Sequence, residues 1–173
     1  MIGSGLKKLA NENGMKVAQG VAYGSLQGFA ATMCEGSGWK SITFSTVITD
    51  PEKKDLFMQN VNSVDIQRVY RVQSLNLAPR NIQVVFLDNP GTMKKIQEFL
   101  VWFIPLLRQA EATTANVCPE CGGEVISGRW VMIDGVAHHM HESCARLVSS
   151  QISEENDRMV AESKGSYFTG IIG

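Results

Sequence analysis

The residues of this chain best suited to chemistry are four potential metal ligands in its C-terminal part. Cys118 and Cys121 form a C-x-x-C pair, and His141 and Cys144 form an H-x-x-C pair with nineteen residues between the two pairs. Thiolates at this spacing can face one ion, and an H-x-x-C pair on the first turn of a helix places both ligands on one side of it. Four such ligands complete the tetrahedron that Zn²⁺ prefers and leave no open position. The spacing therefore predicts one closed, structural zinc site.

The histidine cluster leaves the identity of one ligand open. His141 is favoured because it lies one helical turn from Cys144, and His139 is the alternative ligand. We expect His138 to have no role at the metal, or to support a ligand through a hydrogen bond. A redox-active C-x-x-C pair is less favoured, because such pairs usually begin a helix. Here Gly122-Gly123 instead predicts a tight turn whose backbone N–H groups face the sulfurs.

Residues 117–147 resemble the first zinc-binding half of a LIM domain, or more broadly a treble-clef or zinc-ribbon-like finger. The similarity rests on the two ligand pairs, on Trp130 between them, and on the turn predicted at Asp134-Gly135. A complete LIM domain has a second zinc half, for which this chain offers no further ligands, so the resemblance implies a local shape and no LIM partners. The whole chain also resembles an uncharacterised group of bacterial proteins in which a soluble region precedes membrane-spanning segments. That resemblance implies no activity.

Composition places the chain among globular proteins and limits its partners. Of its 173 residues, 44% are hydrophobic and 19% are charged, and the formal net charge is -1 with no strongly basic stretch. This balance counts against nucleic acid as a partner, because phosphate binding leaves a basic footprint. The first twenty residues contain no unbroken apolar stretch of the kind a signal peptide needs. Four cysteines without such a signal favour a cytoplasmic location and metal binding over disulfides.

Two apolar segments bear on membrane association. The longest run, Phe99 to Leu107, is far shorter than the roughly 20 residues needed to span a bilayer, so it predicts a buried helix. Residues 165–173 are apolar and glycine-rich. We expect them to form either a loosely held tail or the start of a membrane span continuing past Gly173. In the second case the protein would be the cytoplasmic head of a membrane-anchored protein.

Residues 1–110 are expected to form one α+β domain with a mainly antiparallel sheet and helices packed on one face. The sequence predicts helices over 6–13, from Asp50-Pro51 onward and from 89–92 to about 110. Strands are predicted over 17–23, 29–34, 39–48, 69–77 and 81–87, and the period of two in 39–48 indicates a half-buried strand. We further expect a linker at 111–117, a small zinc-binding module at 118–148, and a helix and tail at 149–173.

No common signature of a hydrolase, a nucleotide-binding loop or a metalloprotease occurs in the sequence, and we name no catalytic residue. Cys34 is expected to be a small core residue rather than a nucleophile. Phe99, Trp102, Phe103 and Leu106, at helical spacings, could pack a core or pair two subunits. The sequence thus favours a zinc-binding, non-enzymatic interaction or scaffold module whose partner is a protein or a second copy. The alternatives are a nucleic-acid-binding adaptor that uses the zinc knuckle and, less favoured, a zinc-dependent hydrolase.

Overall fold

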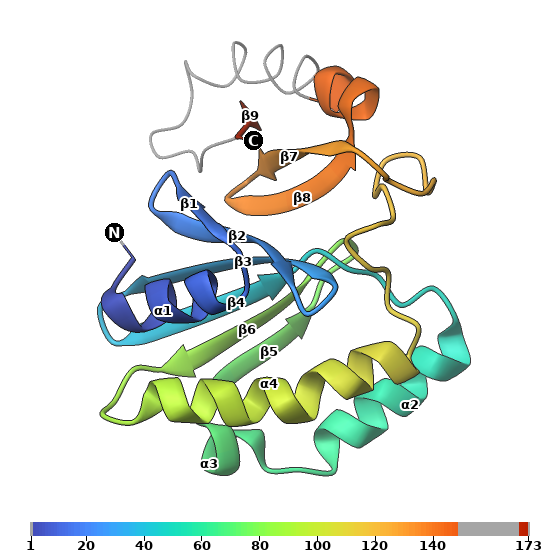
Figure 1. Ribbon diagram of the computed structural model, residues 1–173. Coiled ribbons are helices and arrows are strands. Elements are labelled where there is room, and N and C mark those ends of the chain that lie inside the picture. Colours follow the sequence, from blue (N-terminus) through green and yellow to red (C-terminus); the bar gives the residue numbers. More distant parts are fainter. Residues whose placement is uncertain (1, 149–169, 173) are drawn as a thin grey trace, which may run out of the picture.

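The computed structural model describes residues 2–148 and 170–172, which form two β-sheets and a set of helices (Figure 1). The larger sheet is six-stranded and antiparallel, in the order β1-β2-β3-β4-β6-β5, and the smaller one has the order β8-β7-β9. The strands of the larger sheet are β1 (Lys16–Ala18), β2 (Val21–Leu26), β3 (Phe29–Gly36), β4 (Trp39–Phe44), β5 (Val72–Leu77) and β6 (Ile82–Leu87). Those of the smaller sheet are β7 (Gly128–Ile133), β8 (Val136–His141) and β9 (Gly170–Ile171). The predicted α+β fold is confirmed.

The helices are α1 (Ser4–Glu12), α2 (Pro51–Asn62), α3 (Ile66–Tyr70) and α4 (Thr92–Gln109), and residues 142–148 are also helical. Figure 1 shows α4 on one side of the six-stranded sheet and the hairpin β7–β8 on the other. The rest of the helix and tail that the sequence predicts at 149–173, apart from 170–172, lies outside the described residues. Among the described helices, none is long and apolar enough to cross a membrane.

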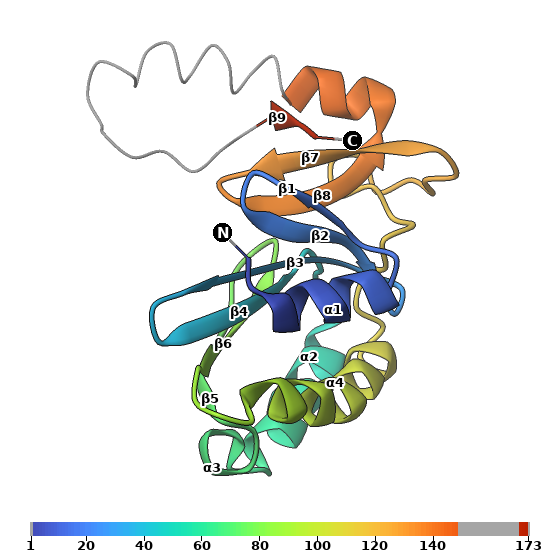
Figure 2. The ribbon, with the colours of Figure 1, turned by 60° about the vertical axis from the view of Figure 1, so that its left-hand side comes forward.

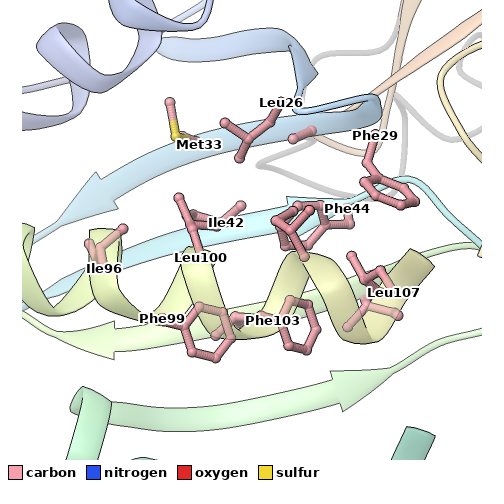
Figure 3. Close-up of a cluster of buried hydrophobic side chains, with 14 of the residues drawn as sticks. Leu26, Phe29, Met33, Ile42, Phe44, Ile96, Phe99, Leu100, Phe103 and Leu107 are labelled. Atoms are coloured by element: carbon pink, nitrogen blue, oxygen red, sulfur yellow. The ribbon is translucent and has the colours of Figure 1, made fainter. Parts of the chain in front are cut away.

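The main core lies between the helices and one face of the larger sheet (Figure 3). Alternate strand residues such as Ile42 and Phe44 point into it, and α4 contributes Phe99 and Phe103, which are completely buried. The apolar run of α4 is therefore a buried helix segment, as predicted. Its aromatic residues pack the core, with Trp102 partly buried at the margin.

The opposite face of the six-stranded sheet, called the back face here, is covered as well. Ser41 and Thr43 of β4 point to it and are only 2% and 6% exposed. On this side β8 lies across the neighbouring strand β3. The prediction of a half-buried strand over 39–48 is therefore wrong in two respects. The back-face residues Ser41 and Thr43 are buried, although Trp39 at the start of the strand is exposed, and the strand ends at Phe44.

Local signals set the starts of the two long helices. The Asp50 carboxylate accepts hydrogen bonds from the backbone N–H groups of Glu52 and Lys53, and Pro51 follows it at the first helical position. The predicted start of α2 is thus confirmed. At α4, Gly91 adopts a left-handed conformation with φ 86°, and the Thr92 hydroxyl hydrogen-bonds the preceding turn, which starts the helix at Thr92.

Two predicted strands are divided in the structure. The segment 17–23 is a hairpin, because Gln19 and Gly20 both have positive φ and turn the chain between β1 and β2. A turn with two positive φ angles matches the natural twist of two paired strands. The segment 69–77 begins with the end of α3, and Arg71, with φ 60°, leads into β5 at Val72.

Residues 111–117 connect α4 to the zinc-ligand segment and are tied to the large sheet. The Ala115 N–H donates to the Gly28 carbonyl (2.8 Å), and the Thr113 N–H donates to the Val47 carbonyl (3.1 Å). The Thr46 hydroxyl also donates to the Thr113 carbonyl at 2.7 Å. This connection therefore fixes where the next segment starts relative to the back face.

Candidate metal centre

The first two candidate ligands lie on a tight turn. The N–H of Gly122 donates to the Cys118 carbonyl (2.8 Å), and the N–H of Cys118 donates to the Gly123 carbonyl (2.9 Å). Gly122 has φ 75°, a conformation that favours glycine. A Cβ on Gly123 would lie 3.3 Å from the His141 ring and 3.5 Å from the Cys121 sulfur. The glycine pair thus allows the predicted tight turn and also a close approach of the ligands. The Gly122 N–H, however, bonds to the Cys118 carbonyl and not to a sulfur.

The second pair of ligands comes from the end of the hairpin and the helix after it. Asp134 and Gly135 both have positive φ and form the predicted turn between β7 and β8. His141 is the last residue of β8, and Cys144 lies in the first turn of the helical segment 142–148. The expectation that His141 and Cys144 both lie on the first turn of a helix is therefore wrong for His141. His141 ends the strand immediately before the helix.

The structure brings Cys118, Cys121, His141 and Cys144 together into one group, called the Cys/His cluster below. Their four ligand atoms all lie within 4.8 Å of one another. Zinc–sulfur bonds near 2.3 Å and zinc–nitrogen bonds near 2.0–2.1 Å give a tetrahedron whose edges are about 3.5–3.8 Å long. The group is thus close to the size of a zinc site. Three thiols and one imidazole are also the donor types that zinc takes in structural sites.

The orientation of the His141 ring distinguishes it from the neighbouring histidines. Its Nδ1 lies 3.3 Å from the Cys121 sulfur, while its Nε2 lies 2.7 Å from the Glu124 carbonyl. A proton on Nε2 would be donated to that carbonyl, which leaves the Nδ1 lone pair facing the sulfurs. Metal-binding histidines usually have such a fixed partner on the second nitrogen. This backbone carbonyl leaves no signal in the sequence, so sequence reasoning missed it.

His139 lies outside the Cys/His cluster. Its Nδ1 is 2.7 Å from the Ala115 carbonyl, and its ring lies against Trp130 with the ring centroids 4.9 Å apart. The side chain therefore joins the segment 111–117 to the small sheet. Of the two histidines that the sequence left open as ligands, the structure groups His141 with the cysteines.

The thiols of the cluster differ strongly in acidity. Burial raises the pKa of the Cys118 thiol, but hydrogen bonds from the backbone near Cys121, His141 and Glu120 outweigh burial and lower the pKa to about 6. Burial, followed by the neighbouring thiols, raises the pKa of Cys144 to about 11. Without a cation, the negative charge of one thiolate makes it harder for a neighbouring thiol to lose its proton. A bound metal ion has the opposite effect and lowers the pKa of these thiols, since thiols that coordinate a metal are deprotonated.

The backbone of Ala137 on β8 attaches the hairpin to the back face. Its N–H donates to the Thr32 hydroxyl (2.7 Å), and its carbonyl accepts from the Ser45 hydroxyl (2.5 Å). Tyr23 and Trp130 add an edge-on ring contact with centroids 5.7 Å apart. The β7–β8 hairpin is thus fixed to the sheet by polar and apolar contacts together.

Cys34 lies apart from the Cys/His cluster. It is half-buried on β3, and its sulfur lies 3.0 Å from the Ser41 hydroxyl on the back face. The residue is therefore not part of the main hydrophobic core, where the sequence placed it.

His138 is a buried histidine, 4% exposed, whose Nδ1 has no hydrogen-bond partner among the described residues. Burial, with a smaller contribution from Arg80, lowers its pKa to about 4. The folded protein therefore holds this ring neutral at pH values where the unfolded chain protonates it.

This difference predicts a pH-dependent loss of stability. The contribution of the neutral His138 ring to the free energy of unfolding is complete above about pH 6.5. It is lost as the pH falls toward about 4, because in this range of pH only the unfolded state binds the proton. The shift corresponds to about 3 kcal/mol. Urea unfolding of the wild type and of His138→Leu across this pH range measures the effect. Between about pH 6.5 and about pH 4 we expect the free energy of unfolding of the wild type to fall by about 3 kcal/mol more than that of the variant. Metal ligands titrate equally in both proteins, so parallel pH curves would contradict the prediction.

No protein-family model, curated protein or solved structure matches the chain.

Proposed function

We propose that this protein is a non-enzymatic interaction or scaffold module whose Cys/His cluster binds one structural Zn²⁺. The observation that supports it best is the geometry of the four donors, with the Nδ1 of His141 turned toward the sulfurs and its Nε2 held by Glu124. In this proposal residues 118–148 act as a zinc-binding module attached to a domain formed by residues 1–110. The knuckle, hairpin and helix order of this module is the feature shared with treble-clef fingers.

The role of the ion follows from its ligands. A structural zinc site has four protein ligands, whereas a catalytic one keeps a position open for water or substrate. The chain supplies all four ligands here, so the ion would crosslink the turn at 118–123 to the end of β8 and to the helix after it. The zinc-dependent hydrolase is therefore disfavoured.

A protein is the partner class that we propose, either a different chain or a second copy of this one. The module exposes Ile126 almost completely (92%) and Leu147 by about half (54%). Its exposed arginines suit nucleic acid poorly, since Arg146 and Arg129 both lie close to the carboxylate of Glu142, at 2.9 and 3.6 Å. Thiol ligands suit a reducing compartment, so a cytoplasmic location is part of this proposal.

Metal analysis of the purified chain tests the proposal directly. We expect about one zinc per chain, and we expect Cys118→Ser to lower the zinc content because a thiolate ligand is lost. Cys34→Ser is the matched control, since Cys34 lies outside the cluster, and it should leave the zinc content unchanged. Equal loss of zinc from the two variants would contradict the assigned ligand set.

Replacement of zinc by cobalt then distinguishes a structural from a catalytic site. A closed Cys₃His site should give the intense visible absorption of tetrahedral, sulfur-rich Co²⁺, and added azide should leave the spectrum unchanged. A spectrum that shifts when azide is added would reveal an exchangeable position and would support the hydrolase instead.

A further inference from the structure

A pocket of about 610 Å³ lies between the back face of the six-stranded sheet and the turn of the β7–β8 hairpin. Strands β3, β4, β5 and β6 form its floor, and Met132, Gly135 and Val136 at the hairpin turn form the opposite wall. Figure 2 shows the hairpin layer and the strands of the large sheet that bound this region. Sites for small organic ligands commonly have volumes of about 300–1,000 Å³. The size is thus that of a small-molecule site.

A row of polar side chains crosses the floor of this pocket. Thr43 on β4 stands opposite Thr32 on β3 and opposite Gln83 on β6. Directly opposed residues on neighbouring strands have Cβ atoms about 4.5–5.5 Å apart, so these groups form a continuous polar strip. Thr32 bonds with Ala137, whereas Thr43 and Gln83 face the space of the pocket.

Thr43 is the most informative residue of this strip. Its side chain is only 6% exposed. Side chains alternate between the two faces along a strand, so Thr43 faces the pocket while its neighbours Ile42 and Phe44 point to the opposite side of the sheet. Its hydroxyl is open to the pocket and is not sealed inside the protein, since the Nδ1 of His138 is the only buried side-chain nitrogen or oxygen without a partner among the described residues. A ligand in the pocket therefore replaces water at this hydroxyl.

Beyond this strip the floor offers apolar surface beside the paired Ser41 and Cys34 side chains. Val85 lies two residues further along β6 than Gln83, and Trp39 begins β4 at the rim, where its side chain is 37% exposed. Among the described residues that line the pocket, Asp134 alone carries a charge. An anionic ligand would lose its water here without gaining a counter-charge, and Asp134, the one carboxylate, is already engaged in an interaction of its own. The walls therefore favour an uncharged ligand with an aromatic face and a polar edge.

We propose that this pocket binds an uncharged aromatic carboxamide or lactam. Its ring lies against Val85 and Trp39, and its amide edge exchanges hydrogen bonds with the Thr43 hydroxyl and the Gln83 carboxamide. A glutamine side chain carries both a donor and an acceptor, which matches the donor and acceptor of an amide. Because the β7–β8 hairpin forms one wall, the site rests on the proposed zinc centre that holds this hairpin.

The test compares two probes of nearly the same shape, naphthamide and naphthoate, by amide NMR titration of the full zinc-loaded chain. Naphthamide is expected to shift the signals of Thr43, Gln83 and the Trp39 indole N–H. Naphthoate should bind at least about tenfold more weakly, because its charge finds no counter-charge on the floor. Equal affinity for the two probes, shifts confined to another surface, or no shift by naphthamide would each overturn the proposal.

Variants locate the binding and separate it from folding. Thr43→Val and Gln83→Leu should each weaken naphthamide binding about fivefold, the usual effect of one lost hydrogen bond. Val85→Trp should block the pocket. The control is Gln97→Leu, which makes the same exchange at an exposed position of α4. Unchanged affinity in Val85→Trp would overturn the proposal.

The zinc content of every sample distinguishes the two proposals. A zinc-loaded chain that fails to bind naphthamide would overturn the pocket alone. A chain that purifies without zinc yet binds naphthamide would leave the pocket standing and overturn the zinc centre. In each protein the zinc content is measured on the sample used for the titration.

Discussion

Cys121→Ser is expected to release the zinc ion and to unfold the β7–β8 hairpin together with the helical segment 142–148. Cys121 is an exposed side chain, so its substitution removes little packing, and any large loss of stability must come through the metal. Apparent zinc-binding free energies in small zinc modules are about 10–16 kcal/mol. That range is comparable with the total stability of a domain, about 5–15 kcal/mol. We therefore expect the module to lose about 5 kcal/mol or more.

Hydrogen exchange and metal analysis measure this effect. Backbone amides of β7 and β8 should lose their protection in Cys121→Ser, while amides at the centre of the large sheet, in β3 and β4, keep theirs. A chelator should cause the same change in the wild type and no further change in the variant. Cys34→Ser is the control and should retain both zinc and protection. The prediction fails if Cys121→Ser keeps its zinc and its protected hairpin.

Phe103→Ala is expected to lower the free energy of unfolding by about 3–5 kcal/mol, the usual cost of truncating a buried phenylalanine. Phe103 is fully buried at the centre of α4 (Figure 3). Its ring stacks on Phe99 with centroids 4.8 Å apart and contacts Phe44 and Phe57 at 5.6 Å. A fourth ring, Trp102, lies with its centroid 6.2 Å away. Removal of the Phe103 ring leaves a cavity and ends four aromatic contacts, of a kind worth about 0.5–1.5 kcal/mol each beyond burial.

Chemical denaturation of Phe103→Ala and of Val101→Ala provides the measurement. Val101 lies on the same helix but is 74% exposed, so its truncation should change stability by less than about 0.5 kcal/mol. Zinc content should stay near one per chain in both folded variants, because Phe103 belongs to a different cluster of buried residues from Cys118. Equal effects of the two substitutions would contradict the assignment of Phe103 to the core.

Each ligand pair could be recognised in the sequence because the spacing within a pair is a local property. Cys118 and Cys121 are two residues apart, and the glycines after them allow the turn that brings their sulfurs together. Helix starts were predictable for the same reason, since Asp50 and Pro51 act on the next turn of backbone. The turn at Gln19-Gly20 has no comparable local signal, because positive φ at a glutamine has no strong sequence signature.

The sequence alone thus determined the α+β class, the buried helix and a group of candidate zinc ligands, because period, capping and ligand spacing act over a few residues. Only the tertiary structure grouped His141 rather than His139 with the cysteines, through the Glu124 carbonyl. It also placed the hairpin on the back face, where Ala137 bonds with Thr32 and Ser45. These contacts join positions 92 and 105 residues apart in the chain. No local pattern encodes such pairs, because they depend on how whole layers pack.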